Sequence, residues 1–358
     1  MKAIRLNENY APAYLWYARF LSIRQGRYHE ALTQLEAALK LDPLSNPIRH
    51  EHAKMVWATG RAEEAMSLLI SYVKDNPEYP PYYKRMTRWQ AQLGDMGRAA
   101  LWVKALRRLE PNSPSHWGEW GGECWVLGRL GDPEATSQCQ QEFVATFPES
   151  VAARRMVASM QAMKAGEMEV LYADVLERDL IDLFEELVRA EPGNDYRANQ
   201  YASFLEQMGQ YEQLLEVMEV AHPQLFGENA SVSGETTWAS TMIINALQMT
   251  GRQEEANRLI TAFESAIAGM RLIAGPGFTT GIEDVEIAAL SGDAELAIQR
   301  FEKSINSGWR FMWDFTPFMT SLKNIHDHPR FNDLFLKMKT DIDQQRAWYD
   351  ENKDAPLY

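Results

Sequence analysis

The feature of this sequence that most constrains its fold is a 34-residue period in its first third. Gly26, Gly60 and Gly94 are each separated by 34 residues. Two other sets of residues keep the same step, namely Ala31, Ala65 and Ala99, and Pro43, Pro77 and Pro111. A fixed period of this length is typical of arrays in which each unit packs on its neighbours, so the sequence predicts a repeat protein.

Each recurring residue type has a physical reason for its place in the unit. The glycine ends a first helix, because a left-handed backbone costs glycine least. The alanine five residues later lets a second helix approach closely. An apolar residue one helical turn further on completes that contact, and it is Leu35, Leu69 or Val103. The proline then stops the second helix, so the unit is predicted to be helix–turn–helix.

The stretch from Gly26 to Pro43 resembles the tetratricopeptide repeat family, whose 34-residue unit has glycine, alanine and proline at these relative places. The resemblance implies an all-α fold, a right-handed α-solenoid of helix pairs. The family's aromatic residue near the start of the first helix is present as Tyr83. It is replaced by Leu15 and Arg49 in the two preceding units.

The pattern continues along the chain with drift, and about eight units are expected over residues 9–307. Wider spacing predicts longer helices or loops in the second half. We therefore expect regular repeats over 1–148, divergent and longer repeats over 149–307, and a capping segment over 308–358. The later turn glycines are Gly131, Gly166, Gly209, Gly251 and Gly292.

The C-terminal segment carries an apolar stripe at helical spacing that begins after Pro329. This stripe predicts a capping helix that covers the last repeat. It is formed by Phe331, Leu334, Phe335, Met338 and Ile342. The segment 307–331 also resembles a stretch of bacterial tetratricopeptide proteins that are fused to winged-helix activators or nucleotide cyclases.

Composition disfavours several classes of partner. The formal charge of -14 makes nucleic acid and anionic membrane surfaces poor partners for the chain as a whole. No apolar run approaches the roughly 20 residues of a membrane helix, and the first residues lack a signal-peptide core, so a cytoplasmic location is expected.

Cys124 and Cys139 are too few for a disulfide framework, and we expect them to be reduced, with a single bridge as the alternative.

Motifs that could carry chemistry are few. The sequence His326-Asp327-His328 contains zinc ligand types without a partner motif elsewhere, and in His50-Glu51-His52 the two histidines point to different sides of a helix. The glycine-rich stretch 275–277 is not followed by the lysine of a phosphate-binding loop. We therefore expect neither metal nor cofactor, and no enzymatic activity.

The resemblance implies a candidate groove, because the first helices of tetratricopeptide units line the concave face of the array. Cations and aromatics gather at the places that point into it. Trp16 and Phe20 stand where the family's carboxylate clamp has polar residues, and a solvated face with chance aromatics remains an alternative. The mapped residues are Trp16, Phe20, Arg24, His50, Lys54, Trp57, Lys84, Arg88, Trp125 and Arg129.

These observations favour a protein–protein interaction module within a bacterial regulatory or assembly system. Its groove is expected to bind a peptide segment of another protein, acidic or carboxylate-ended. The alternative is a ligand-sensing effector domain of a bacterial transcriptional regulator or cyclase whose output domain is absent from this chain.

Overall fold

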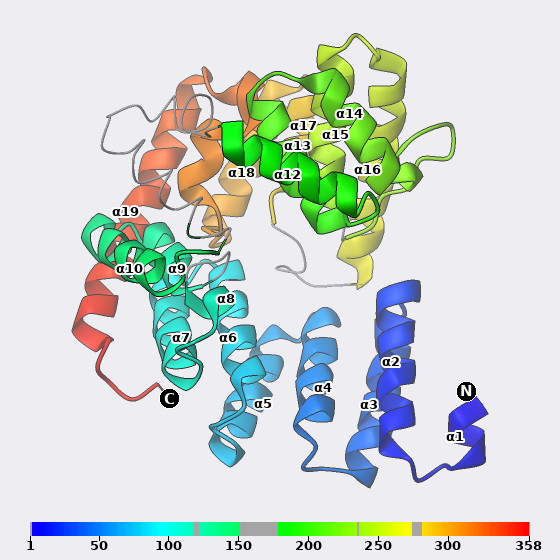
Figure 1. Cartoon of the computed structure of the whole chain (residues 1–358), viewed down its shortest axis with the longest axis vertical. Helices are drawn as coiled ribbons and strands as arrows, with labels where there is room; N and C mark the ends of the chain where they lie inside the picture. The colour runs from blue at the N-terminus through cyan, green and yellow to red at the C-terminus, as the bar shows by residue number, and fades with distance from the viewer. Residues whose placement is uncertain are drawn as a thin grey trace.

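The computed structural model describes residues 2–117, 122–150, 153, 178–234, 236–273 and 281–357. Within these ranges the regular structure is helical, and the helices follow one another as an all-α solenoid (Figure 1). The first half contains α1 (Lys2–Leu6), α2 (Ala11–Gln25), α3 (Tyr28–Leu41), α4 (Asn46–Ala58), α5 (Ala62–Asp75), α6 (Pro80–Gln92), α7 (Met96–Leu109), α8 (Pro114–Trp117), α9 (Glu123–Arg129) and α10 (Pro133–Thr146).

The second half continues the pairing with less regular lengths. The longest helix of its pairs, α16, has 21 residues, and the segment 226–236 joins two pairs, so the wider glycine spacing reflects both a longer helix and a longer connection. The elements are α12 (Arg178–Ala190), α13 (Asp195–Gln207), α14 (Tyr211–Ala221), the 3₁₀ turn η1 (Pro223–Leu225), α15 (Thr237–Met249), α16 (Gln253–Ile273), α17 (Glu283–Leu290) and α18 (Ala294–Asn306).

The predicted turn glycines are confirmed wherever the structure describes them. Gly26 ends α2 with φ 63° and donates its N–H back into the last turn of that helix. The same positive φ occurs at Gly60, Gly94, Gly131, Gly209, Gly251 and Gly292, whereas Gly166 lies outside the described residues. The three alanines of the period are fully buried between paired helices, as their small size predicts.

The predicted helix stops are confirmed as well. Helices α3, α5 and α7 each end two residues before the proline of their unit. The apolar partners of the alanines, Leu35, Leu69 and Val103, are at most 1% exposed. Each unit thus buries its own helix–helix contact, and apolar contacts to the next unit extend the core along the array.

The two cysteines correct the expectation of reduced thiols. Cys124 in α9 and Cys139 in α10 form a disulfide, with their Cα atoms 5.4 Å apart. The turn at Gly131 folds α10 back on α9, so two positions 15 residues apart face each other across one helix pair. A spacing of 15 residues does not indicate this contact until the turn between the helices is placed.

The C-terminal segment folds as the 3₁₀ turns η2 (Trp313–Phe318) and η3 (Thr320–Ile325), followed by α19 (Pro329–Asn352). The predicted capping helix is confirmed, because α19 packs on α18 and η2. Phe335 is only half-buried and rests against the Trp313 ring, with 5.5 Å between the centroids. The remaining residues of the predicted stripe, Phe331, Leu334, Met338 and Ile342, are buried.

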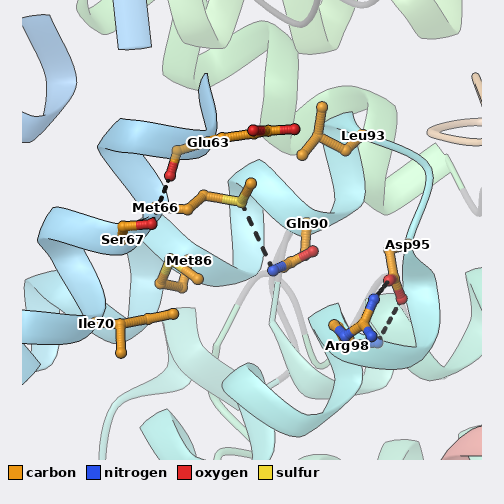
Figure 2. A pocket seen from close by; sticks show the side chains of 9 residues that line it. All are labelled: Glu63, Met66, Ser67, Ile70, Met86, Gln90, Leu93, Asp95 and Arg98. Atoms are coloured by element: carbon orange, nitrogen blue, oxygen red, sulfur yellow. Dashed lines mark hydrogen bonds and ion pairs between the residues drawn. The ribbon is translucent and has the colours of Figure 1, made fainter. Parts of the chain in front are cut away.

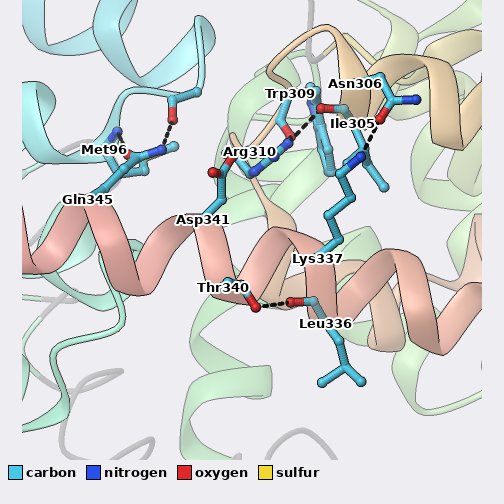
Figure 3. Close-up of polar contacts among 11 residues, drawn as sticks. Met96, Ile305, Asn306, Trp309, Arg310, Leu336, Lys337, Thr340, Asp341 and Gln345 are labelled. Carbon is cyan, nitrogen blue, oxygen red and sulfur yellow. Dashed lines mark hydrogen bonds and ion pairs between the residues drawn. The ribbon is translucent and has the colours of Figure 1, made fainter.

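Helix α19 also does something that the sequence did not predict: it runs back along α7 (Figure 1). Gln345 Oε1 accepts a hydrogen bond from the backbone N–H of Met96 at 2.7 Å (Figure 3). Earlier in the same helix, Asp341 forms an ion pair with Arg310, and Lys337 Nζ donates to Asn306 Oδ1 at 2.5 Å. One helix therefore contacts both an early pair, α6–α7, and the late pair α17–α18.

The same junction brings two turns into direct contact. A methyl group added at Gly94 would lie 1.8 Å from the carbonyl oxygen of Gly308, so no side chain fits there. The core around this junction is continuous and combines residues from 91–153 with residues from 282–349. The third helix pair, α6–α7, is consequently held against the last pair, α17–α18.

Candidate functional site

The candidate site lies on α2, α4 and α6, the first helices of the first three pairs. These helices follow one another from right to left across the lower half of Figure 1. We call their shared polar and aromatic face the first-helix surface. It is formed by Trp16, Arg19, Phe20, Ile23, His50, Glu51, Lys54, Lys84, Arg85 and Arg88.

An exposed apolar row runs along α2. Trp16 is 63% exposed, Phe20 50% and Ile23 60%. Their spacing of four and three residues places them on one side of the helix, opposite the buried Ala18 and Leu21. Single exposed apolar side chains are ordinary, but a contiguous row is typical of a binding surface.

A buried carboxylate organises the cations beside this row. Glu51 is 4% exposed and accepts from Arg19 Nη2 at 2.8 Å and from Lys54 Nζ at 2.8 Å. Burial by itself would raise the pKa of Glu51, but Lys54 and Arg19 together bring it below its ordinary value. Arg19 also lies 5.1 Å from the centre of the Trp16 ring, which links the charged cluster to the apolar row.

Helix α6 adds cations without a matching carboxylate. Among the described residues, no acidic side chain forms an ion pair with Lys84, Arg85 or Arg88. Burial, and then the charge of Arg88, lowers the pKa of Arg85 to about 10, and Arg85 Nε is buried without a hydrogen-bond partner in the described structure. The first-helix surface therefore has five cations and one carboxylate, a surplus of 5 − 1 = 4 positive charges in a chain of net charge -14.

His50 completes the cluster as a neutral group. Burial, followed by the nearby charge of Arg85, lowers its pKa to about 3, and its Nε2 atom has no hydrogen-bond partner among the described residues. A neutral imidazole beside surplus cations can donate a hydrogen bond to an anion without adding charge. His52, two residues further on, instead approaches the Tyr72 hydroxyl at 3.4 Å, on another side of α4.

The structure brings together part of the predicted groove. Trp16 and Phe20 are exposed on α2, Lys54 is paired with Glu51, and Lys84 and Arg88 are exposed on α6. Arg24 lies in α2, but its side chain is outside the described residues.

Trp57 differs from the expectation of an open groove residue, because it is only 6% exposed. Its ring stacks on Trp89 of α6, with centroids 4.5 Å apart and planes 5° from parallel. The apolar area of Trp57 is thus used between neighbouring units and is not presented to a partner.

Trp125 and Arg129 are also placed elsewhere, in contact with the C-terminal segment. Arg129 pairs with Asp314 at 2.5 Å, and its backbone oxygen accepts from Trp313 Nε1 at 2.8 Å. Trp125 packs on Phe311, with 5.7 Å between the ring centres. These two residues join the fourth helix pair to the end of the chain, so they do not extend the first-helix surface.

Four residues of the first-helix surface were missed by reasoning from the sequence: Arg19, Ile23, Glu51 and Arg85. Ile23 could have been found, because it follows Phe20 by three residues in the same helical row. The other three lie between the positions mapped from the turn glycines, and their contacts depend on how α2, α4 and α6 are rotated about their axes.

A separate pocket of about 470 Å³ opens between α5, α6 and α7 (Figure 2). Met66, Ile70, Met86 and Leu93 supply its apolar lining. At its edge Arg98 pairs with Asp95 at 2.6 Å, and Glu63 lies opposite, so the charged lining has a net charge of -1. This pocket lacks the surplus of positive charge that distinguishes the first-helix surface.

A second polar cluster holds the C-terminal segment to the later pairs. Glu206 accepts from Asn245 Nδ2 and from Thr320 Oγ1, both at 2.8 Å, and Ser321 Oγ donates to Glu286 at 2.9 Å. Burial, and then the neighbouring Glu283, raises the pKa of Glu286 to about 8, so this carboxyl is largely protonated at neutral pH. The hydrogen bonds fix η3 against α13, α15 and α17.

The candidate zinc ligands make separate hydrogen bonds. His326 Nε2 lies 2.9 Å from the Thr316 carbonyl oxygen, whereas His328 Nε2 lies 3.0 Å from Glu295 and its Nδ1 accepts from the start of α19. In the described ranges no three His, Cys, Asp or Glu side chains gather where they could hold a metal ion. The glycine stretch 275–277 falls outside those ranges.

The fold and this surface define an α-solenoid repeat protein with a cationic and aromatic face on its early helices. Residues 22–93 match the family model described as tetratricopeptide repeat, so this part of the chain consists of tetratricopeptide repeats. The match extends from the end of α2 through α6 and covers most of the residues that build the first-helix surface.

Solved structures to which the chain is similar include a tetratricopeptide repeat protein and a TPR domain. One, from Parabacteroides merdae ATCC 43184, has 12% identity, a TM-score of 0.39, and coverage of 92% of this chain and 98% of its own. The P58(IPK) TPR domain has 13% identity, a TM-score of 0.29 and coverage of 97% and 99%. Yeast Tom70 has 10% identity, a TM-score of 0.30 and coverage of 98% for both chains. No functionally curated protein matches the chain.

These similarities are too distant to carry function. Across the described residues, no helix combines the length and the apolar composition needed to cross a membrane.

Proposed function

We propose that this chain is a protein–protein interaction module and that its first-helix surface binds a peptide segment of another protein. The observation that carries the proposal is that cations of α6, which form no ion pair among the described residues, share one surface with the exposed apolar row of α2, with α4 between them. The preferred segment is acidic or carboxylate-ended and partly apolar, and we place the module in a bacterial regulatory or assembly system. We assign it no catalytic step.

The physical chemistry of the surface supports this role. Trp16 and Phe20 offer large contact areas with few rotatable bonds, so a partner loses little side-chain entropy on binding them. Lys84 and Arg88 attract negative charge and set its position more than they add affinity, because exposed charges remain partly hydrated, and the partly buried Arg85 adds to the same positive field. The strong negative charge of the remaining chain opposes binding elsewhere, so we expect micromolar affinity, about −8 kcal/mol, confined to this face.

The experiment is a selection of displayed random 16-residue peptides on the full chain, followed by fluorescence titration of the enriched peptides. We expect acidic, partly apolar peptides whose binding weakens with salt. The double variant Lys84→Ala/Arg88→Ala should bind less tightly and show a smaller salt dependence.

A matched control makes the same change of charge on second helices. Lys40 and Arg108 are exposed cations on α3 and α7. The double variant Lys40→Ala/Arg108→Ala should bind the peptides as wild type does. Equal affinity of the wild type and the Lys84→Ala/Arg88→Ala variant, or a stronger effect of the control pair, would show that the site is elsewhere.

A further inference from the structure

The geometry of the apolar row on α2 contains information about the shape of its partner. Trp16, Phe20 and Ile23 follow one side of the helix over two turns, about 10 Å at 1.5 Å per residue. Their side chains form a ridge along that side, with Arg19 against the Trp16 ring, while Ala18 and Leu21 on the other side of the helix are buried. A ridge of this kind fits between the side-chain rows of another helix, which repeat at three and four residues.

The row has little capacity for hydrogen bonding, and this also favours a helical partner. Phe20 and Ile23 have no polar side-chain atoms, and Trp16 has only its indole N–H. A peptide in an extended conformation would place its own amide and carbonyl groups against these side chains without partners, which costs free energy. A helix satisfies those backbone groups internally, so it can lie on an apolar row without that loss.

The charges beside the row then determine the composition of one flank of that helix. Arg19 is already engaged by Glu51, whereas Arg85 and Arg88 form no ion pair among the described residues. A helix with its side chains is about 10–12 Å wide, comparable with the separation of packed helices, so a helix that rests on α2 turns one flank over α4. Arg85 of α6 interacts electrostatically with Glu51 of α4, so its charge lies on the side to which that flank points. Acidic side chains on that flank would complement the surplus positive charge.

We propose that the occupant of the first-helix surface is an amphipathic α-helix of a partner protein, with an apolar stripe against Trp16, Phe20 and Ile23 and an acidic flank towards Arg85 and Arg88. This inference rests on the proposed function and adds the conformation of the bound segment. An extended segment with alternating apolar residues is the outcome that opposes it.

The test uses two designed 18-residue peptides of identical composition. In the first, leucines recur at i, i+3, i+4 and i+7, glutamates occupy one flank, and a side-chain lactam holds the helix. In the second, leucine and glutamate alternate, so the peptide is amphipathic only when extended. We expect the helical peptide to bind the full chain at least about tenfold more tightly in fluorescence anisotropy, and a central proline in it to abolish that advantage.

Variants of the protein locate the contact. Phe20→Ala and Ile23→Ser should each weaken the helical peptide about fivefold to tenfold, a typical range for interface anchors. Arg85→Ala/Arg88→Ala should reduce the salt dependence of binding. Leu336→Ala removes an exposed apolar side chain from α19 and should change nothing. Thermal melts of each variant establish that the fold is retained, which matters most for Arg85, since its Nε atom is buried.

The outcomes separate the two proposals. If the alternating peptide binds the first-helix surface as tightly as the helical one, the helix inference is wrong while the proposed function stands. The same holds if peptides enriched from the random library map to this surface but show a period of two. If neither designed peptide nor any library peptide binds there, the proposed function fails together with the inference.

Discussion

Gln345, near the end of the last helix, donates from Nε2 to the carbonyl oxygen of Gly94 at 2.9 Å, across 251 residues of sequence. Its Oε1 atom accepts the backbone N–H of Met96 at 2.7 Å. One side-chain amide thus caps the start of α7 and binds the turn before it. Because the first N–H groups of a helix have no partner within the helix, Gln345 satisfies a donor that would otherwise need water.

We expect Gln345→Ala to lower the free energy of unfolding by about 1–2 kcal/mol, since it removes the hydrogen bonds of the amide to Gly94, Met96 and Gly97 and leaves a partly buried donor unpaired. Chemical denaturation followed by circular dichroism measures this change. Gln344→Ala is the matched control, because Gln344 is the exposed neighbour in the same helix. If both variants lose the same stability, the contact with Gly94 and Met96 does not hold α19 in place.

Phe335→Ala should cost about 1–2 kcal/mol, less than the loss of a fully buried aromatic residue, because part of the Phe335 side chain remains exposed while its ring packs on Trp313. Leu336 is 48% exposed and lies next to it in α19. Leu336→Ala should change stability by no more than about 0.5 kcal/mol. A cost for Phe335→Ala as small as that of the control would mean that its contact with Trp313 contributes nothing.

The disulfide between Cys124 and Cys139 predicts a response to reductant. Opening a 15-residue loop should lower the unfolding free energy by about 3 kcal/mol. A melt with and without reductant measures the effect, and the double variant Cys124→Ala/Cys139→Ala should melt at one temperature in both conditions. Two reactive thiols in the unfolded, unreduced protein would contradict the bridge.

Because the pKa of Glu286 is raised, we expect its contribution to the free energy of unfolding to fall as the pH rises. Burial and the facing carboxyls Glu283, Glu206 and Asp284 raise its pKa from 4.5 to about 8, while Ser321 donates to it. The folded protein therefore keeps a proton that the unfolded chain releases. This contribution is fully present below pH 4.5 and is lost as the pH approaches 8.

Glu286→Gln keeps the shape of the side chain and removes the titration, so its stability should depend less on pH between 5 and 8. At pH 8 it should exceed the wild type by up to about 4 kcal/mol, the upper value that a shift of this size allows. Denaturation at several pH values gives both slopes. Glu254→Gln, at an exposed position of α16, should follow the wild type. An unchanged slope in Glu286→Gln would show that Glu286 is ionised in the folded state.

The repeats could be predicted because their signals are local. Gly26 ends a helix through its own backbone conformation, and Ala31 is small where two neighbouring helices meet, so neither depends on distant residues. The contact of Gln345 with Gly94 could not be predicted in this way. A polar residue on the flank of a helix has no period, and its partner is set by the curvature that accumulates over several units.

The candidate site could likewise be predicted only in part. Trp16 and Phe20 are exposed because their places in a first helix point away from its pair, and the repeat period gives those places. The burial of Trp57 depends on Trp89 in the next unit, whose indole occupies the space that a partner would need. The pairing of Glu51 with Arg19 and Lys54 likewise depends on the rotation of adjacent helices, which a 34-residue period does not specify.

The contact of α19 with α7 distinguishes two parts of the molecule: the helices between these two elements and the helices that precede α7. The pairs between α7 and α18 are clasped at both ends, so they cannot uncoil as an open array does. Helices α1 to α6 precede this clasp and form an arm whose main contacts, among the described residues, are within the arm and with α7. The first-helix surface lies on this arm, so a partner that binds it need not open the contact of α19 with α7.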